Sequence, residues 1–128
     1  MDSLLIQCKK VIEMKVLYDK SDENAVVSLL MEDFLGIVEG SKCFDIYAVQ
    51  GEQRHLISKL MMKMKDSAKN YTGIIIRISG SKTLSIKACK NVVENIAAVT
   101  VPETKIIWGA SAREDIGEKV QVFVIGFY

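Results

Sequence analysis

The last fifty-odd residues constrain the fold most strongly, because strand and helix periodicities follow one another there. Residues 72–81, TGIIIRISGS, alternate in side-chain direction along an apolar run and end in glycine, which predicts a strand and a turn. Residues 86–97 then place apolar side chains at helical spacing. Residues 106–126, IIWGASAREDIGEKVQVFVIG, predict two further strands separated by an acidic turn.

The upstream residues add a strand and two helices to this pattern. Apolar side chains recur at helical spacing over residues 3–18, and residues 44–49 alternate as a strand. From residue 52 to about 68 a second helical stripe follows. Taken together, these strands and helices predict an α/β fold, an α+β two-layer sandwich in which a four-stranded mixed sheet carries two helices on one face. Residues 1–128 have the length of a single domain.

Two helices can cover only one face of such a sheet. The other face would carry Ile75, Phe123 and Ile125, which are too apolar to remain in water. We therefore expect either the N-terminal helix, residues 3–18, or another molecule to lie across it.

Charge and cysteine content exclude several classes of protein. The 17 basic and 16 acidic residues nearly cancel to a net charge of +1, which argues against a nucleic-acid partner. No apolar run is long enough to span a bilayer, and the N-terminus lacks the layout of a signal peptide. Cys8, Cys43 and Cys89 are widely spaced in apolar surroundings, which predicts buried thiols of a reduced, cytoplasmic protein.

The sequence offers little that indicates catalysis. His55 follows Arg54 at a helix start and is expected to be solvated, while Cys89 falls on an apolar stripe and is expected to pack. We find no pair of spaced carboxylates, no nucleophile with an available base and no metal cluster. The prediction is a chain without catalytic, cofactor or metal sites, and therefore not an enzyme.

Two side-chain groups admit more than one interpretation. Met61, Met62 and Met64 favour core packing over an adaptable binding surface, since two of them fall on the core stripe. A set of lysines on the two helices indicates either a solvated face or a surface for an acidic partner; these are Lys59, Lys63, Lys69, Lys87 and Lys90.

Three segments together resemble the C-terminal domain of the FtsZ/tubulin superfamily: GEQR at 51–54, TGIIIRISGS at 72–81 and the strand, Gly-Ala, acidic turn and valine alternation of 106–126. The resemblance covers roughly residues 24–128. It implies that residues 1–20 correspond to the end of the family's central helix and would cover the apolar sheet face. No glycine-rich phosphate loop of a GTP-binding domain is present in the sequence.

The resemblance also implies where contacts with other proteins would lie. The loop by which the family's C-terminal domain presents acidic residues to a neighbouring subunit's nucleotide should fall near residues 29–38. Asp33 can stand for one acid of the usual pair there, but Leu30 or Gly36 then occupies the place of the other. Glu32 beside Asp33 does not restore the spacing, because helix neighbours point about 100° apart.

A second contact region is implied at the charged loop between the last two strands. In FtsZ-like filaments, loops at this end touch the next subunit. The predicted interaction residues are therefore Glu32, Asp33, Arg113, Glu114 and Asp115.

The sequence thus favours a non-catalytic protein-interaction module that contacts or regulates a filament-forming division or cytoskeletal GTPase, or that self-associates. The alternative is a small-molecule-binding or enzymatic two-layer α/β domain, since fold alone does not decide function. A further alternative is that the chain is a piece of a larger GTPase.

Overall fold

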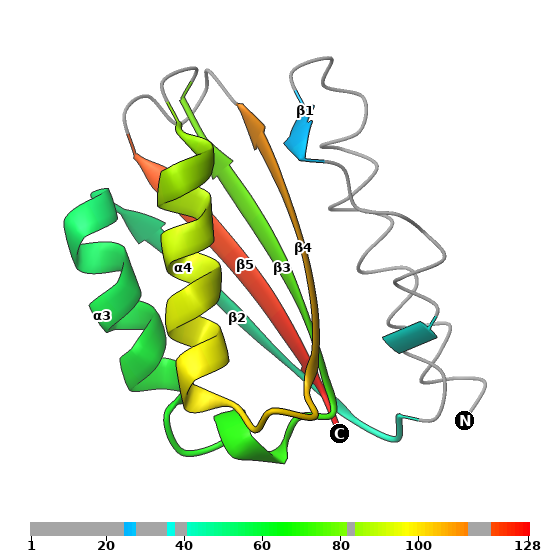
Figure 1. Ribbon diagram of the computed structural model, residues 1–128. Coiled ribbons are helices and arrows are strands. Elements are labelled where there is room, and N and C mark those ends of the chain that lie inside the picture. Colours follow the sequence, from blue (N-terminus) through cyan, green and yellow to red (C-terminus); the bar gives the residue numbers. More distant parts are fainter. Residues whose placement is uncertain (1–24, 28–35, 38–40, 82–83, 113–118) are drawn as a thin grey trace.

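Two helices cover one face of a mixed β-sheet in the computed structural model (Figure 1). The structure describes residues 25–27, 36–37, 41–81, 84–112 and 119–128. The strands are β1 (Ala25–Val27), β2 (Phe44–Gly51), β3 (Gly73–Gly80), β4 (Lys105–Ala112) and β5 (Val120–Phe127). The helices are α3 (Gln53–Met64) and α4 (Ile86–Val99), with a 3₁₀ turn η1 at Ala68–Asn70.

The strands lie in the order β1-β4-β3-β5-β2. Only the β3–β4 pair is parallel, and α4 supplies the crossover that a parallel connection requires. The pairs β1–β4, β3–β5 and β2–β5 are antiparallel. The predicted four-stranded mixed sheet with two helices is therefore confirmed. The three-residue strand β1 extends it by pairing with β4, and the sequence pattern did not predict that strand.

The core lies between the sheet and the two helices. Ile74, Ile76 and Ile78 of β3 face the helices and are fully buried. From α3 the core receives Leu60 and Met64 as predicted, together with Leu56, while the predicted Ile57 and Met61 are partly buried. From α4 it receives Cys89, Val92 and Ile96, which belong to the predicted stripe. Each such side chain contributes about 1.5–3 kcal/mol on burial. Helix α4 begins where Ser85 Oγ accepts a hydrogen bond from Ala88 N at 3.1 Å.

The opposite face of the sheet is also buried over its central strands. Ile75 and Ile125, which alternate with the helix-facing residues, are only 2% and 1% exposed within this chain. Part of their cover is Ile37, because a Cβ at Gly73 would come within 2.4 Å of Ile37 Cγ2. Residues 3–18 lie outside the described residues, so their predicted position across this face stays a prediction.

Three tyrosines and an aspartate tie β2 to the start of β3 and to the chain end. The Tyr71 hydroxyl donates to Asp45 Oδ2 at 2.7 Å and shares a hydrogen bond with the Tyr47 hydroxyl. The Tyr128 ring lies 6.0 Å from the Tyr71 ring, centre to centre. Burial, with added effect from the hydrogen bonds to Tyr47 and Asp45, raises the pKa of Tyr71 far above its ordinary value.

The Tyr71 ring packs directly on the backbone of Gly126, which predicts a large effect of a small substitution. A Cβ at position 126 would lie 2.6 Å from three ring carbons of Tyr71. We expect Gly126→Ala to lower the free energy of unfolding by about 1–3 kcal/mol, because the buried ring must shift. Chemical denaturation measures this. Gly36→Ala is the matched control, since nothing lies within 4 Å of a Cβ there; equal stability of the two variants would contradict the contact.

The raised pKa of Tyr71 predicts a pH dependence of stability. The unfolded phenol titrates near pH 10 and the folded one higher, so its stabilisation is complete below about pH 10 and is lost as the pH rises above it. Tyr71→Phe should flatten this loss. At neutral pH it should also cost about 1–3 kcal/mol, because Asp45 and Tyr47 lose a buried partner.

Urea denaturation of the unmodified protein and of Tyr71→Phe, from pH 7 to 11, separates the contribution of Tyr71 to the pH dependence from that of the other titrating groups. The pKa values of Cys89, through burial, and of Tyr128, mainly through the Asp45 charge, are also raised, but both groups are present in each protein. If the free energies of unfolding of the two proteins fell in parallel as the pH rises, Tyr71 would not be the cause of the loss.

Candidate interaction surfaces

The predicted contact residues lie outside the part of the chain that the structure describes. This applies to Glu32, Asp33, Arg113, Glu114 and Asp115, and their roles stay predictions. The structure does place the two ends from which the charged loop departs. Ala112 ends β4 beside Gly80, the end of β3, and Val120 begins β5 opposite Gly51, the end of β2.

The same end of the sheet holds the beginnings of both helices. Helix α3 begins at Gln53, directly after β2, and α4 begins at Ile86, shortly after β3. The end of β4, the start of β5 and the starts of the two helices therefore share one end of the domain (Figure 1).

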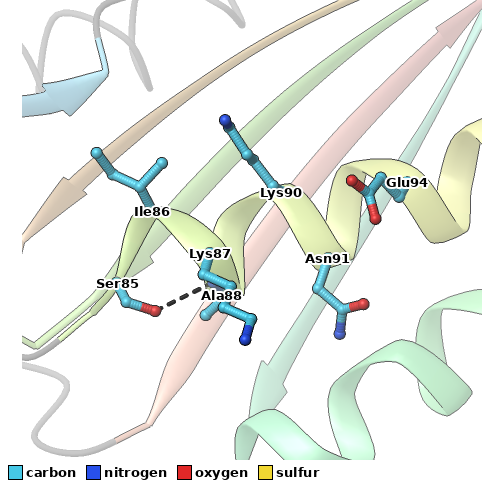
Figure 2. A pocket seen from close by; sticks show the side chains of 7 residues that line it. All are labelled: Ser85, Ile86, Lys87, Ala88, Lys90, Asn91 and Glu94. Atoms are coloured by element: carbon cyan, nitrogen blue, oxygen red, sulfur yellow. Dashed lines mark hydrogen bonds between the residues drawn. The ribbon is translucent and has the colours of Figure 1, made fainter.

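A shallow hollow runs along the outer side of α4 near its N-terminus (Figure 2). Its described lining comes entirely from Ser85 and α4: Ser85, Ile86, Lys87, Ala88, Lys90, Asn91 and Glu94. Figure 2 shows Ile86 and Lys90 pointing to one side of the helix and Asn91 to the other. Ligand pockets gather convergent polar groups from several elements.

The lysines predicted to form a basic face are all exposed. Lys59 and Lys63 lie on α3, Lys69 in η1, and Lys87 and Lys90 on α4. Exposure agrees with the solvated interpretation and leaves a surface available to an acidic partner. Ile86, 48% exposed at the start of α4, adds an apolar side chain to this surface.

The two residues considered for acid–base or nucleophilic chemistry are placed as expected. The His55 side chain is 62% exposed, and its Nε2 lies 3.9 Å from Glu52 Oε2, a surface pair of little energetic weight. Cys89 is 1% exposed, and burial raises the pKa of its thiol, which disfavours the reactive thiolate.

One expectation about the cysteines is wrong. Cys43 was predicted to be buried, but it is exposed. It lies just before β2, where the chain pairs with Tyr128 at the end of the sheet. Cys8 lies outside the described residues. Among the methionines, Met64 is buried and Met61 half-buried as predicted for the core stripe, and Met62 is 75% exposed.

The Asp45–Tyr47–Tyr71 cluster was missed by the sequence analysis. Its members are separated by up to 26 residues and belong to no motif, and only the strand alternation at Tyr47 hinted at its orientation. Burial and the hydrogen bonds to Tyr47 and Asp45 raise the pKa of Tyr71, so its phenol stays protonated at neutral pH, and the hydrogen bonds link β2 to the residue before β3. Within the described residues, no group of three potential metal ligands occurs. No helix there has the length and apolar character needed to cross a membrane.

Known proteins resemble this chain in sequence and in fold. A model of the FtsZ family, C-terminal domain, matches residues 47–127. A stretch of 56 residues is 30% identical to the cell division protein FtsZ of Methanothermobacter thermautotrophicus, covering 44% of this chain and 15% of that protein.

Solved structures agree with this match. An empty FtsZ dimer from M. jannaschii superposes with a TM-score of 0.75 at 17% identity, over 92% of this chain and 36% of that one. CetZ2 from Haloferax volcanii, in a GTPγS-bound protofilament, superposes with a TM-score of 0.52 at 8% identity, over 80% of this chain and 34% of that one. The chain thus spans about a third of the length of these proteins. Because the family match covers more than half of the chain, this protein belongs to the FtsZ family, and the matched part is the C-terminal domain.

Proposed function

We propose that this chain is a non-catalytic protein-interaction module that contacts an FtsZ-type filament protein, or another copy of itself, in the cytoplasm. The observation that carries the proposal is the match of residues 47–127 to the FtsZ C-terminal domain. Contacts between folded domains need complementary surfaces rather than reactive side chains. This proposal accounts for both the family membership and the lack of catalytic motifs.

The contact region is expected at the end of the sheet where the helices begin. Arg113, Glu114 and Asp115 belong to the loop anchored there by Ala112 and Val120. The exposed Ile86 lies at the same end, and apolar side chains bordered by charges are typical of protein interfaces. Glu32 and Asp33 remain the second proposed contact, on the strength of the resemblance alone.

The alternative of a small-molecule site finds less support. Among the described residues that line the hollow on α4, the capping Ser85 already accepts a hydrogen bond from Ala88 N. We therefore propose no substrate and no cofactor.

Capture of the tagged protein from its own cells, with the recovered proteins identified by mass spectrometry, tests the proposed partner. An FtsZ-type GTPase should be recovered, and the purified chain should then co-sediment with that protein's GTP-dependent polymers. The purified chain alone should hydrolyse GTP no faster than buffer. Absence of any FtsZ-type protein, together with GTP turnover by the chain, would overturn the proposal.

Charge changes test the proposed contact residues. Arg113→Glu combined with Asp115→Lys, and separately Asp33→Ala, should each weaken co-sedimentation about tenfold, since interface charges at this level are worth about 1.4 kcal/mol. Glu103→Lys is the matched control, an exposed charge between α4 and β4 at the opposite end of the sheet. Unchanged affinity for both test variants would remove these surfaces from consideration.

A further inference from the structure

Strand β2 is the outer strand of the sheet at the edge far from β1 (Figure 1). Its register with β5 runs without interruption from Phe44 to Gly51, so no bulge breaks the edge. Within the described residues, β5 is the only strand that pairs with it. A long, regular edge strand is a template for another strand unless the protein protects it with charges, prolines or bulges.

The phase of the β2–β5 ladder shows which backbone groups face outward. Cys43 and Tyr128 exchange both hydrogen bonds, with Cys43 N donating to Tyr128 O at 2.8 Å and Tyr128 N to Cys43 O at 2.9 Å. In an antiparallel ladder, bonded pairs alternate with non-bonded ones. The odd-numbered residues of β2 therefore bond to β5. The N–H and C=O groups directed away from β5 belong to Phe44, Ile46, Ala48 and Gln50.

The same four residues place their side chains on the sheet face away from the helices, since Tyr47 and Val49 pack with the helix-side core. Ile46 is 42% exposed, and Ala48 and Gln50 are exposed as well. None of the four is charged or proline, so these positions lack two of the usual protections of an edge strand. Over β3 and β5 this face is buried at Ile75 and Ile125, which confines the exposure to the edge.

The charges near β2 are arranged so that a second copy fits. Asp45 lies near one end of the strand on the helix side. Lys59 of α3 lies near the other end, because a Cβ at Gly51 would be 3.1 Å from its Nζ. A two-fold axis perpendicular to the sheet at Ala48 sets Asp45 of each copy opposite Gly51 of the other, beside Lys59. With this axis, the carboxylate of Asp45 in each copy comes near Lys59 of the other, an opposite-charge contact that suits an antiparallel self-pairing.

We propose that β2 pairs antiparallel with β2 of a second copy of this chain about a two-fold axis at Ala48, forming one continuous sheet. This names the surface for the self-association that the proposed function includes. The backbone groups of Ile46, Ala48 and Gln50 bond across the axis, and the Asp45–Lys59 pair fixes the register at each end. Edge pairing over one strand buries a small area, so the dimer is weak and its population depends on concentration.

Sedimentation equilibrium of the purified chain tests the dimer without any GTPase present, so its outcome is independent of filament binding. The unmodified protein should pass from monomer to dimer as concentration rises. Ala48→Lys places two ammonium groups against each other at the axis and should weaken dimerisation at least about tenfold. Met62→Lys adds the same charge at a 75% exposed position of α3 and should leave the dimer unchanged.

A second pair of variants tests the register. Lys59→Glu faces Asp45 of the second copy with a like charge and should weaken the dimer about threefold to tenfold. Lys63→Glu, an exposed lysine one turn further along α3, should have no effect. A dimer equally sensitive to both changes would overturn the axis at Ala48.

Amide hydrogen exchange resolved by NMR provides a measurement on the unmodified chain, which no folding defect of a variant can confuse. Raising the concentration should slow exchange at Ile46, Ala48 and Gln50. Exchange at Tyr47 and Val49, already bonded to β5, should change little. A monomer at all concentrations, or a dimer that survives Ala48→Lys with no added protection at these three amides, would overturn the proposal.

Discussion

The rest of the structure depends on the complete burial of the central strand. All eight residues of β3 are buried, and it is bordered by β4 and β5 and covered on both faces. The two faces of β3 are covered by different parts of the chain. Ile74, Ile76 and Ile78 need the helices, whereas Ile75 needs a second cover. Both faces of the sheet therefore have to be covered at that strand, because large apolar side chains on either face are unfavourable in water.

The sequence predicted this part of the fold because the signals are local. The isoleucine run at 74–78, the valine alternation at 120–124 and the helical stripes each lie within one element. The ties between elements were not predictable in the same way. Tyr71 packs on Gly126 and bonds to Asp45, and no pattern within a strand or helix links residues so far apart. Strand β1 was missed for a similar reason, since three residues are too few to establish an alternation.

The family could be recognised more readily than the contacts. The motifs at 72–81 and 106–126 contain the ends of strands and the turns that follow them. Packing within the fold determines which residues can occupy those positions. Contact residues are set by a partner's shape and charge, so they leave no spacing rule in a single chain. Cys43 shows that the exposure of a residue at the end of a strand is also hard to predict from its neighbours in the sequence. Its apolar neighbours favoured burial, but its place before β2 at the end of the sheet leaves it exposed.

The two edges of the sheet differ in how far their backbone hydrogen-bonding groups are paired within the described residues. At one edge, β4 is paired by β1 through Ala25 and Ser111, so part of its outer ladder is satisfied within the chain. At the other edge, β2 is as long as the central strand and carries uncharged side chains wherever its backbone faces outward. On the helix side, the hydrogen bond between Asp45 and Tyr71 joins β2 to the residues before β3, in addition to the ladder with β5. Pairing at a rigid edge loses little conformational entropy, because only the incoming strand has to become ordered. If that strand is a second β2, even this cost is small, since the same tyrosine cluster orders it in advance.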